Sequence, residues 1–332
     1  SQYIGDLKNW ETFSFYTESL DRFRHLFRFT PSVLVCDMHP DYLSSQEAER
    51  VAARTGLPLL KIQHHHAHAA ACMLEYGLHE KVIAIVLDGT GLGDDGKVWG
   101  GEFFLCDRKE CRRLSHFEYV PLPGGDKAAV EPWRMAVAYL WHYWGDSACF
   151  PEGFSERVGA DKIRLLMTMM ERGVNTPYTS GAGRLFDAVA SLLGLCDVST
   201  HQAEAPVKLE QAAGSEQSAR YPVIIKEGVI SLFEGLLNDW ASGVSVGDLA
   251  ARFHNTMAFL LLDEAARHLQ QTGATRVVIS GGCFQNRRLT EQLQRLFAAK
   301  GIPLYVPGRI PCNDGGVAVG QLAIAASRNK KD

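Results

Sequence analysis

Short apolar runs alternate with amphipathic stretches in the first quarter of the chain. The runs "SVLVCDMHP" and "LPLLKIQ" are typical of buried strands bounded by polar residues or proline. Between them, "SSQEAERVAARTG" has a helical period, with Ser44 and Ser45 as N-cap candidates and Gly56 as the stop signal. The pattern predicts a β-α-β-α layer fold: a lead-in that contains a helix (1–30), a strand (32–40), a helix (44–56), a strand (57–63) and a helix that opens with histidines.

The rest of the chain combines hairpins with longer helices. "KVIAIVLDGTGLGDDGKVWGGEFFLCD" contains two apolar strands around a tight "GDDGK" turn, which predicts a β-hairpin. Residues 145–180 are rich in helix and loop, and we expect them to form an inserted cap. The other expected elements are a helix within 119–141, a helix at 181–195, a short helix within 199–214, a hairpin near 223–235, a long helix at 245–273, a strand, glycine turn, helix and strand at 276–307, a helix within 311–328 and a frayed tail at 329–332.

Composition narrows the class of protein without identifying it. The 332 residues are 46% apolar and 22% charged, which is ordinary for a globular protein of one large or two medium domains. A net charge of −4 gives no electrostatic reason to expect nucleic acid or a membrane surface as the main partner. The eight cysteines contain no CxxC pair, so we expect reduced, mainly buried thiols in a cytoplasmic protein. The polar start without Met suggests a segment of a longer polypeptide.

Four histidines in five positions are the most unusual feature of the sequence. In "QHHHAHAAACM", His64 and His68 are four residues apart, so a helix would place both rings on one face. Two imidazoles at this spacing can hold a divalent metal, as in the HExxH arrangement. The glutamate of that arrangement is absent, which disfavours a metalloprotease. The alternative is a helix N-terminus whose histidines are solvated or hydrogen-bonded.

Two imidazoles need further ligands, and two aspartates are candidates. Asp88 ends an apolar strand at a glycine turn, and Asp314 precedes a helix in "CNDGG". Either carboxylate could complete a metal shell. Equally, Asp88 could form a turn and Asp314 could act as an N-cap.

Glycine-rich turns provide candidates for anion binding. Gly281-Gly282 follows a buried strand and precedes a helix that begins near Asn286, an arrangement that suits phosphate or nucleotide, although the turn matches neither GxGxxG nor GxxxxGK[ST]. Cys283 in this turn fits a small packed residue better than a nucleophile. The segment Asp88-Gly89-Thr90-Gly91 is similar to the phosphate-binding hairpin of actin-like ATPases. Asp187 and Glu210 are helical acids that could hold ribose hydroxyls or lie on a solvated face.

Taken together, six motifs in order resemble the C-terminal domain of the HypF family, the carbamoyltransferases of [NiFe]-hydrogenase maturation. They are "QHHHAHAAACM", "LDGTGLGDDGKVWGGEF", "LPGGDKAAVEPWRMA", "HQAEAPVKLE", "SGGCFQNRRL" and "PCNDGGVAVGQ". This domain is similar to the TsaD family of threonylcarbamoyl transferases. The resemblance implies an actin/Hsp70-like (ASKHA) α/β fold with helical insertions. It would comprise a lead-in (1–30) and a TsaD-like domain (31–332), with two RNase H-like lobes (about 31–180 and 181–332) around a nucleotide cleft.

The resemblance also assigns roles to individual residues. It implies a metal held by His64, His68 and Asp314, with Asp88 close to metal and phosphate. The nucleotide-binding residues that it implies are Gly89, Thr90, Gly91, Asp187, Glu210, Gly281, Gly282 and Asn286. Glu210 is the least secure of these, because Ala205-Pro206 replaces the glycine pair of TsaD. The expected cofactors are zinc or iron, an ATP-derived nucleotide and, as a further candidate, magnesium.

The activity implied by the resemblance is transfer of a carbamoyl group from carbamoyl-adenylate to the C-terminal cysteine thiolate of HypE, which forms a thiocarbamate and AMP. The expected partners are therefore the HypE tail and the N-terminal modules that full-length HypF carries ahead of this domain. Two alternatives remain open. The first is an O-carbamoyltransferase or a TsaD-like threonylcarbamoyl transferase, and the second is a nucleotide-binding scaffold without chemistry.

Overall fold

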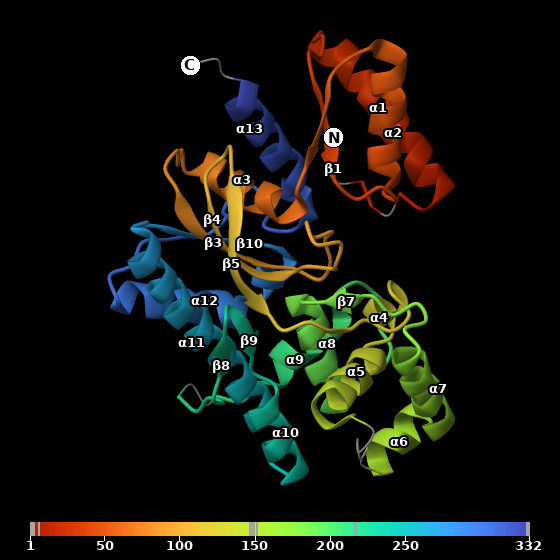
Figure 1. Ribbon diagram of the computed structural model, residues 1–332, viewed down its shortest axis with the longest axis vertical. Helices are drawn as coiled ribbons and strands as arrows, with labels where there is room; N and C mark the ends of the chain where they lie inside the picture. Colours follow the sequence, from red (N-terminus) through yellow and green to blue (C-terminus); the bar gives the residue numbers. More distant parts are fainter. Residues whose placement is uncertain (1–3, 6, 146–149, 151, 216–217, 330–332) are drawn as a thin grey trace.

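The computed structural model describes residues 4–329 except residues 6, 146–149, 151 and 216–217, and it confirms the α/β class. Figure 1 shows a central sheet, a smaller body with helices α1 and α2 at one end, and a mainly helical region at the other. Within the described part, none of the helices combines the length and apolar character needed to cross a membrane. Cys149 and the last three residues of the expected frayed tail lie outside the described residues.

The central sheet has seven strands and is mixed. Strand β3 (Val82–Leu87) lies in its middle, and all six of its side chains are buried, which explains the uninterrupted apolar run "VIAIVL". The neighbours of β3 are the parallel strand β10 and the antiparallel strand β4. The order across the sheet is β11 (Leu304–Tyr305), β10 (Val277–Ser280), β3, β4 (Gly101–Cys106), β5 (Cys111–Phe117), β9 (Val229–Ser231) and β8 (Ile224–Lys226).

This sheet extends across the expected division of lobes near residue 180, and that division stays a prediction. Strand β3 pairs with β10, and β5 pairs with β9, so the sheet is built from segments on both sides of residue 180. The smaller sheet is separate, because β1 (Leu34–Asp37) pairs in parallel only with β2 (Leu59–Ile62) among the described strands. The two sheets therefore divide the chain between β2 and β3. Sequence pattern alone missed this because each half contains plausible strand–helix units.

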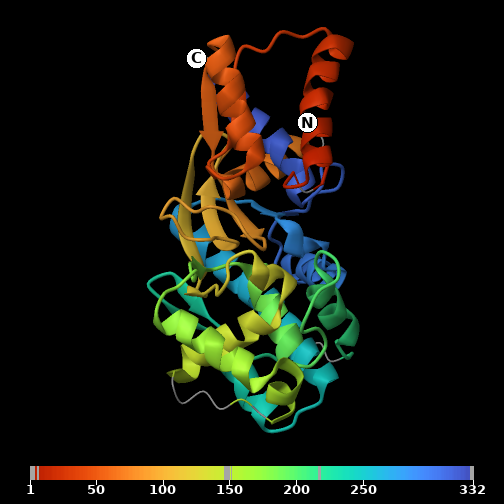
Figure 2. The same cartoon turned by 90° about the vertical axis from the view of Figure 1, so that its right-hand side faces the viewer.

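Helix α1 (Trp10–Phe27) lies at the same end of the molecule as the smaller sheet (Figure 2). Helix α2 (Leu43–Thr55) connects its strands and ends at Gly56, as predicted, with a φ of 70°. The N-cap prediction was wrong: Tyr42 occupies that position, and the Ser45 hydroxyl donates instead to the carbonyl of Asp37. Helix α3 (His64–Glu75) packs against α13 (Val317–Asn329).

The remaining elements cover the central sheet and form the helical region. The predicted long helix is α11 (Val246–Thr272), which packs against α12 (Arg287–Ala299). The expected cap contains α6 (Glu152–Val158), α7 (Ala160–Glu171) and strand β7 (Tyr178–Thr179), which pairs with β6 (Val120–Pro121). The other helices are α4 (Lys127–Val130), α5 (Trp133–Trp144), α8 (Ala182–Leu192), α9 (Glu204–Ala212) and α10 (Glu234–Ala241), with short 3₁₀ turns at Gly282–Gln285 and Asp314–Gly316.

Candidate metal centre and nucleotide site

Helix α3 fixes the histidines through tight packing and an N-cap. The Gln63 side chain accepts a hydrogen bond from the backbone N–H of His66 at 2.8 Å, which starts the helix directly after β2. The alanines that follow are buried, so another helix can approach closely. A Cβ atom on Gly320 of α13 would lie 1.8 Å from the carbonyl oxygen of Ala67, so only glycine fits there. The close contact between α3 and α13 holds the N-terminus of α3 beside the central sheet.

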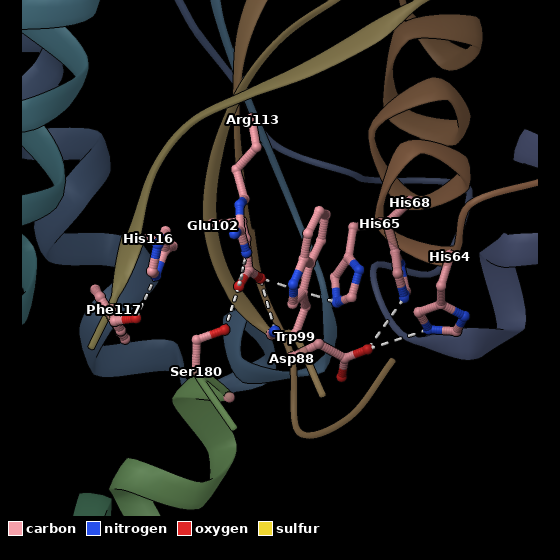
Figure 3. Close-up of polar contacts among 12 residues, drawn as sticks. His64, His65, His68, Asp88, Trp99, Glu102, Arg113, His116, Phe117 and Ser180 are labelled. Carbon is pink, nitrogen blue, oxygen red and sulfur yellow. Dashed lines mark hydrogen bonds and ion pairs between the residues drawn. The ribbon is translucent and has the colours of Figure 1, made fainter. Parts of the chain in front are cut away.

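Four side chains converge at this N-terminus. The Nε2 atoms of His64 and His68 both lie 3.3 Å from Asp88 Oδ2 and 3.5 Å from Asp314 Oδ1. Figure 3 shows both rings pointing toward Asp88. Four ligand atoms about 2.1 Å from one tetrahedral ion are separated by about 3.4 Å. The observed spacing therefore fits a single divalent cation held by two imidazoles and two carboxylates.

The charges of the cluster favour a cation. Burial opposes ionisation of Asp88, but the contacts with His64 and His68 hold the pKa of its carboxyl well below the usual range. The pKa of Asp314 is also lowered, because the same imidazoles outweigh its burial. Burial opposes a charged His64, yet the acids raise its pKa well above the usual value. The two ionised carboxylates are thus stabilised by positive charge in the cluster, which protons on the imidazoles or a divalent metal can supply.

The histidine run divides into two candidate metal ligands and two other buried residues. The other two rings of the run are buried but lie outside the four-residue cluster. Burial lowers the pKa of His65 to about 3, so this ring is neutral. The Nε2 atom of His66 lies 2.7 Å from the carbonyl oxygen of Asp107 and ties α3 to the turn after β4. The run of four histidines therefore contributes both to the site and to the packing of α3.

Asp37 supports the site and was missed by sequence reasoning. Its Oδ2 atom lies 2.7 Å from His64 Nδ1, on the side of the ring opposite the cluster. A carboxylate in this place fixes the orientation of the ring and leaves Nε2 for the metal. The available signal was the same as for Asp88, because both aspartates stand at the end of a buried strand.

The predicted phosphate hairpin lies beside this cluster. Gly91 packs against the histidines, since a Cβ atom there would lie 2.5 Å from His65 Cε1. Thr90 is exposed, so its backbone is accessible to a ligand, whereas the N–H of the partly exposed Gly89 donates to Asp88 Oδ1 at 2.8 Å. A Cβ atom on Gly89 would lie 3.2 Å from Arg184 Nη2. Arg184 is a second residue that sequence reasoning missed, and it places a cation next to the hairpin.

The glycine turn after β10 also borders the cluster. Gly281 has a φ of 104°, and a Cβ atom there would lie 2.2 Å from the Leu87 carbonyl oxygen, so it permits the close approach to β3. At Gly282 the nearest atom to such a Cβ is Asp88 Oδ1, at 3.3 Å. Burial raises the pKa of the Cys283 thiol well above its usual value, which fits a packed residue and not a nucleophile.

The three other predicted nucleotide residues are engaged by protein groups. Asn286 is the N-cap of α12, accepting from the N–H of Leu289 at 2.9 Å. Asp187 pairs with Arg184 at 2.9 Å, and burial raises the pKa of Asp187 to about 6. Glu210 accepts from the N–H of Arg288 at 3.0 Å. Their roles in nucleotide binding remain predictions.

A buried acid holds the hairpin in place. The Glu102 side chain is inaccessible to solvent and accepts hydrogen bonds from the N–H of Gly100 at 2.6 Å and from the hydroxyl of Ser180 (Figure 3). Burial raises the pKa of Glu102 to about 8. Because Gly100 pairs with Asp88 and Ser180 leads into α8, this acid joins the base of the hairpin to that helix. Its sequence signal was a lone acid in the apolar strand "GEFFLC".

Comparison with known proteins places the whole chain in one group. Residues 1–75 match the model of the "HypF Kae1-like domain", and residues 84–321 match "Carbamoyltransferase, Kae1-like Domain, second subdomain". The division between the two matches agrees with the division between the two sheets. The chain is 41% identical to the carbamoyltransferase HypF homolog of Cupriavidus necator, over 87% of this chain and 76% of that protein.

Longer relatives and a solved structure agree with this match. Carbamoyltransferase HypF2 of Cupriavidus necator is 35% identical over 99% of this chain, which spans 44% of that relative. The crystal structure of full-length HypF in the phosphate- and nucleotide-bound form has a TM-score of 0.93 and 37% identity, and the match covers 100% of this chain and 52% of the other. The chain thus corresponds to about half of these longer proteins and has the same fold.

Proposed function

Because the chain belongs to the HypF family of carbamoyltransferases, as its matches over residues 1–75 and 84–321 show, we propose that it transfers a carbamoyl group from carbamoyl-adenylate to a thiolate. The observation that carries this proposal is the convergence of two imidazoles and two carboxylates beside two glycine turns. A scaffold without chemistry would not need four ligand atoms at the separation that one cation requires. The phosphate and nucleotide in the similar HypF structure support a nucleotide ligand.

In the proposed reaction, the acceptor sulfur attacks the carbamoyl carbon. A carbon–sulfur bond forms, the bond between that carbon and the phosphate oxygen breaks, and AMP leaves with the electron pair. A zinc or iron ion held by His64, His68, Asp88 and Asp314 would act as a Lewis acid that polarises an oxygen of the substrate. Asp37 keeps the Nε2 atom of His64 directed at the cluster.

The residues of the hairpin and the second turn position the nucleotide. In this proposal, backbone N–H groups of Thr90 and Gly282 bind the phosphate, Gly89 lets it approach without meeting a side chain, and Arg184 adds a positive charge beside Gly89. Asp187, Glu210 and Asn286 hold the nucleoside in this proposal. The chain's contribution is then mainly orientation and charge stabilisation.

The proposed acceptor is the C-terminal cysteine of HypE, and the donor comes from modules that longer HypF proteins carry outside the matched region. Carbamoyltransferase HypF2 of Cupriavidus necator is more than twice as long as the segment of it that this chain matches. That difference supports a division of labour in which carbamoyl-adenylate forms elsewhere and is consumed here.

Supplied carbamoyl-adenylate and a peptide that ends in cysteine test the proposal directly. The chain should add one carbamoyl group to the peptide thiol and release AMP, as detected by mass spectrometry and chromatography. His64→Ala/His68→Ala should lose this transfer, whereas the surface variant His79→Ala should retain it. Unchanged transfer in the double variant would refute the role of the cluster, and carbamoylation of a serine or threonine peptide instead would refute the thiol acceptor.

A further inference from the structure

Asp314 is the exposed member of the four-residue cluster. Its side chain is 55% exposed, whereas the side chains of His64, His68 and Asp88 are at most 13% exposed. Asp314 follows a loop (306–313) that connects β11 to the last 3₁₀ turn, and is not in a long helix or a central strand. Something must hold this loop if the carboxylate is to stay within 3.5 Å of both imidazoles.

The Glu75 carboxylate accepts hydrogen bonds from the backbone of this loop. Its Oε1 atom accepts from the N–H groups of Gly308 at 3.0 Å and Arg309 at 2.8 Å, and its Oε2 atom accepts from Ile310 at 3.0 Å. The hydroxyl of the next residue, Tyr76, donates to the carbonyl of Val306 at 2.6 Å. One carboxylate therefore engages three consecutive amides, more than 230 positions away in sequence.

Helix stability does not explain an acid at this position. Glu75 is the last residue of α3, where the helix dipole disfavours negative charge. The last turn contains no basic residue that would compensate. The three amides compensate instead, and they hold the pKa of Glu75 below its usual value although its partial burial opposes this. The interactions of Glu75 are thus directed at the loop and not at its own helix.

The same helix contributes to the site at both ends. The N-terminal turn of α3 carries His64 and His68, and its last residue holds the loop that leads to Asp314. After Asp314 the chain enters α13, which is fixed against Ala67 by the close approach at Gly320. The segment that contains Asp314 is therefore attached to α3 on both sides.

We propose that Glu75 is a positioning residue. By fixing residues 308–310, it holds the Asp314 carboxylate in place as a metal ligand. This inference rests on the proposed metal centre and adds a residue that acts on it from a distance. It requires that Glu75 acts on metal affinity through Asp314 and not through the histidines of its own helix.

A double-mutant cycle of Zn²⁺ affinity tests this requirement. Zn²⁺ binding is measured by competition with a chromogenic chelator for the parent chain, Glu75→Ala, Asp314→Ala and the double variant. Glu75→Ala should weaken binding by about 10-fold, as is typical of residues that orient ligands. In the Asp314→Ala background the same change should weaken it by less than about 2-fold, because the two residues are coupled.

Two controls separate positioning from general destabilisation. Glu80→Ala removes an acid that pairs with Arg276 instead of with residues 308–310, and it should leave the affinity unchanged. Glu75→Gln keeps an acceptor oxygen and should recover part of the loss. Hydrogen exchange of the amides of residues 308–310 should accelerate in Glu75→Ala while circular dichroism stays the same.

The outcomes distinguish this inference from the proposed function. An equal loss from Glu75→Ala in both backgrounds would show that Glu75 acts through α3, and an unchanged affinity despite faster exchange would show that the loop does not control the ligand. Either result overturns the positioning role and leaves the metal centre intact. A parent chain that binds no Zn²⁺ or Fe²⁺ would overturn the metal centre itself.

Discussion

Among the described residues, two clusters that combine buried histidine with carboxylate differ in whether they offer the ligand atoms of a metal site. The first comprises His64, His68, Asp88 and Asp314, as described above. The second lies between β5 and α11 and comprises Ser115, Glu264, Arg267 and His268. There, His268 Nε2 lies 2.7 Å from the Ser115 hydroxyl and 3.0 Å from Glu264 Oε1.

The difference between the clusters is the balance of donors and charge. Glu264 receives a hydrogen bond from Arg267 Nε at 2.8 Å, so a permanent cation compensates its charge. The charge of Glu264 is therefore compensated without a ligand. In the first cluster, two carboxylates face two imidazoles with no arginine or lysine among the four, and protons or a metal must supply the positive charge. A buried histidine and acid are thus evidence for a site only when the protein leaves their charge uncompensated.

Breaking the first cluster should cause the largest loss of metal affinity. His64→Ala/His68→Ala should reduce Zn²⁺ affinity by more than the roughly 10–100-fold that is typical of residues outside the ligand shell. The cause is the loss of two ligand atoms that no neighbour replaces. Chelator competition measures the affinity, and Glu264→Gln serves as the contrast because it should leave affinity unchanged. Equal losses in both variants would remove the distinction between the clusters.

A smaller effect on stability should follow from breaking the second cluster. Glu264→Gln leaves the Arg267 guanidinium and His268 without their anionic partner and should lower the free energy of unfolding by about 1–3 kcal/mol. Urea unfolding measures this change. Glu291→Gln is the matched control, since it removes an exposed pair with Arg287 that is worth less than about 1 kcal/mol. A Glu264→Gln variant as stable as the control would show that the second cluster is not structural.

A substitution of Asp37 tests how His64 is oriented in the first cluster. Asp37→Asn keeps the size of the side chain but weakens its interaction with His64 Nδ1, so Zn²⁺ affinity should fall by about 10-fold. The same titration measures it. If Asp37→Asn bound Zn²⁺ as tightly as the parent chain, the orientation of His64 would have to come from packing alone.

The smallest effect concerns acid stability. Burial opposes ionisation of Glu264, but Arg267, His268 and Ser115 lower its pKa to about 2. An unfolded glutamate titrates near about pH 4.3, so the stability that Glu264 contributes is complete above that pH and is lost as the pH falls toward 2. The Tm of the parent should therefore fall more steeply than that of Glu264→Gln between these values. Parallel Tm curves would contradict this assignment.

The pattern of the sequence predicted the local elements of the site better than their assembly. Local periodicity was enough to predict that His64 and His68 share a helix face and that a buried strand precedes Asp88. The composition of the central sheet was not predictable in this way, since the pairing of β3 with β10 depends on contacts almost 200 residues apart. Arg184 and Glu75 were missed for the same reason: their partners, Gly89 and residues 308–310, are distant in sequence.

In the proposed metal centre, four side chains hold one divalent cation. A crystal of the Zn²⁺-loaded chain, with anomalous data collected on both sides of the zinc absorption edge, measures this directly. We expect one strong anomalous peak within bonding distance of the Nε2 atoms of His64 and His68 and of carboxylate oxygens of Asp88 and Asp314. A peak elsewhere, or none at this position in a chain that retains its fold, would contradict it.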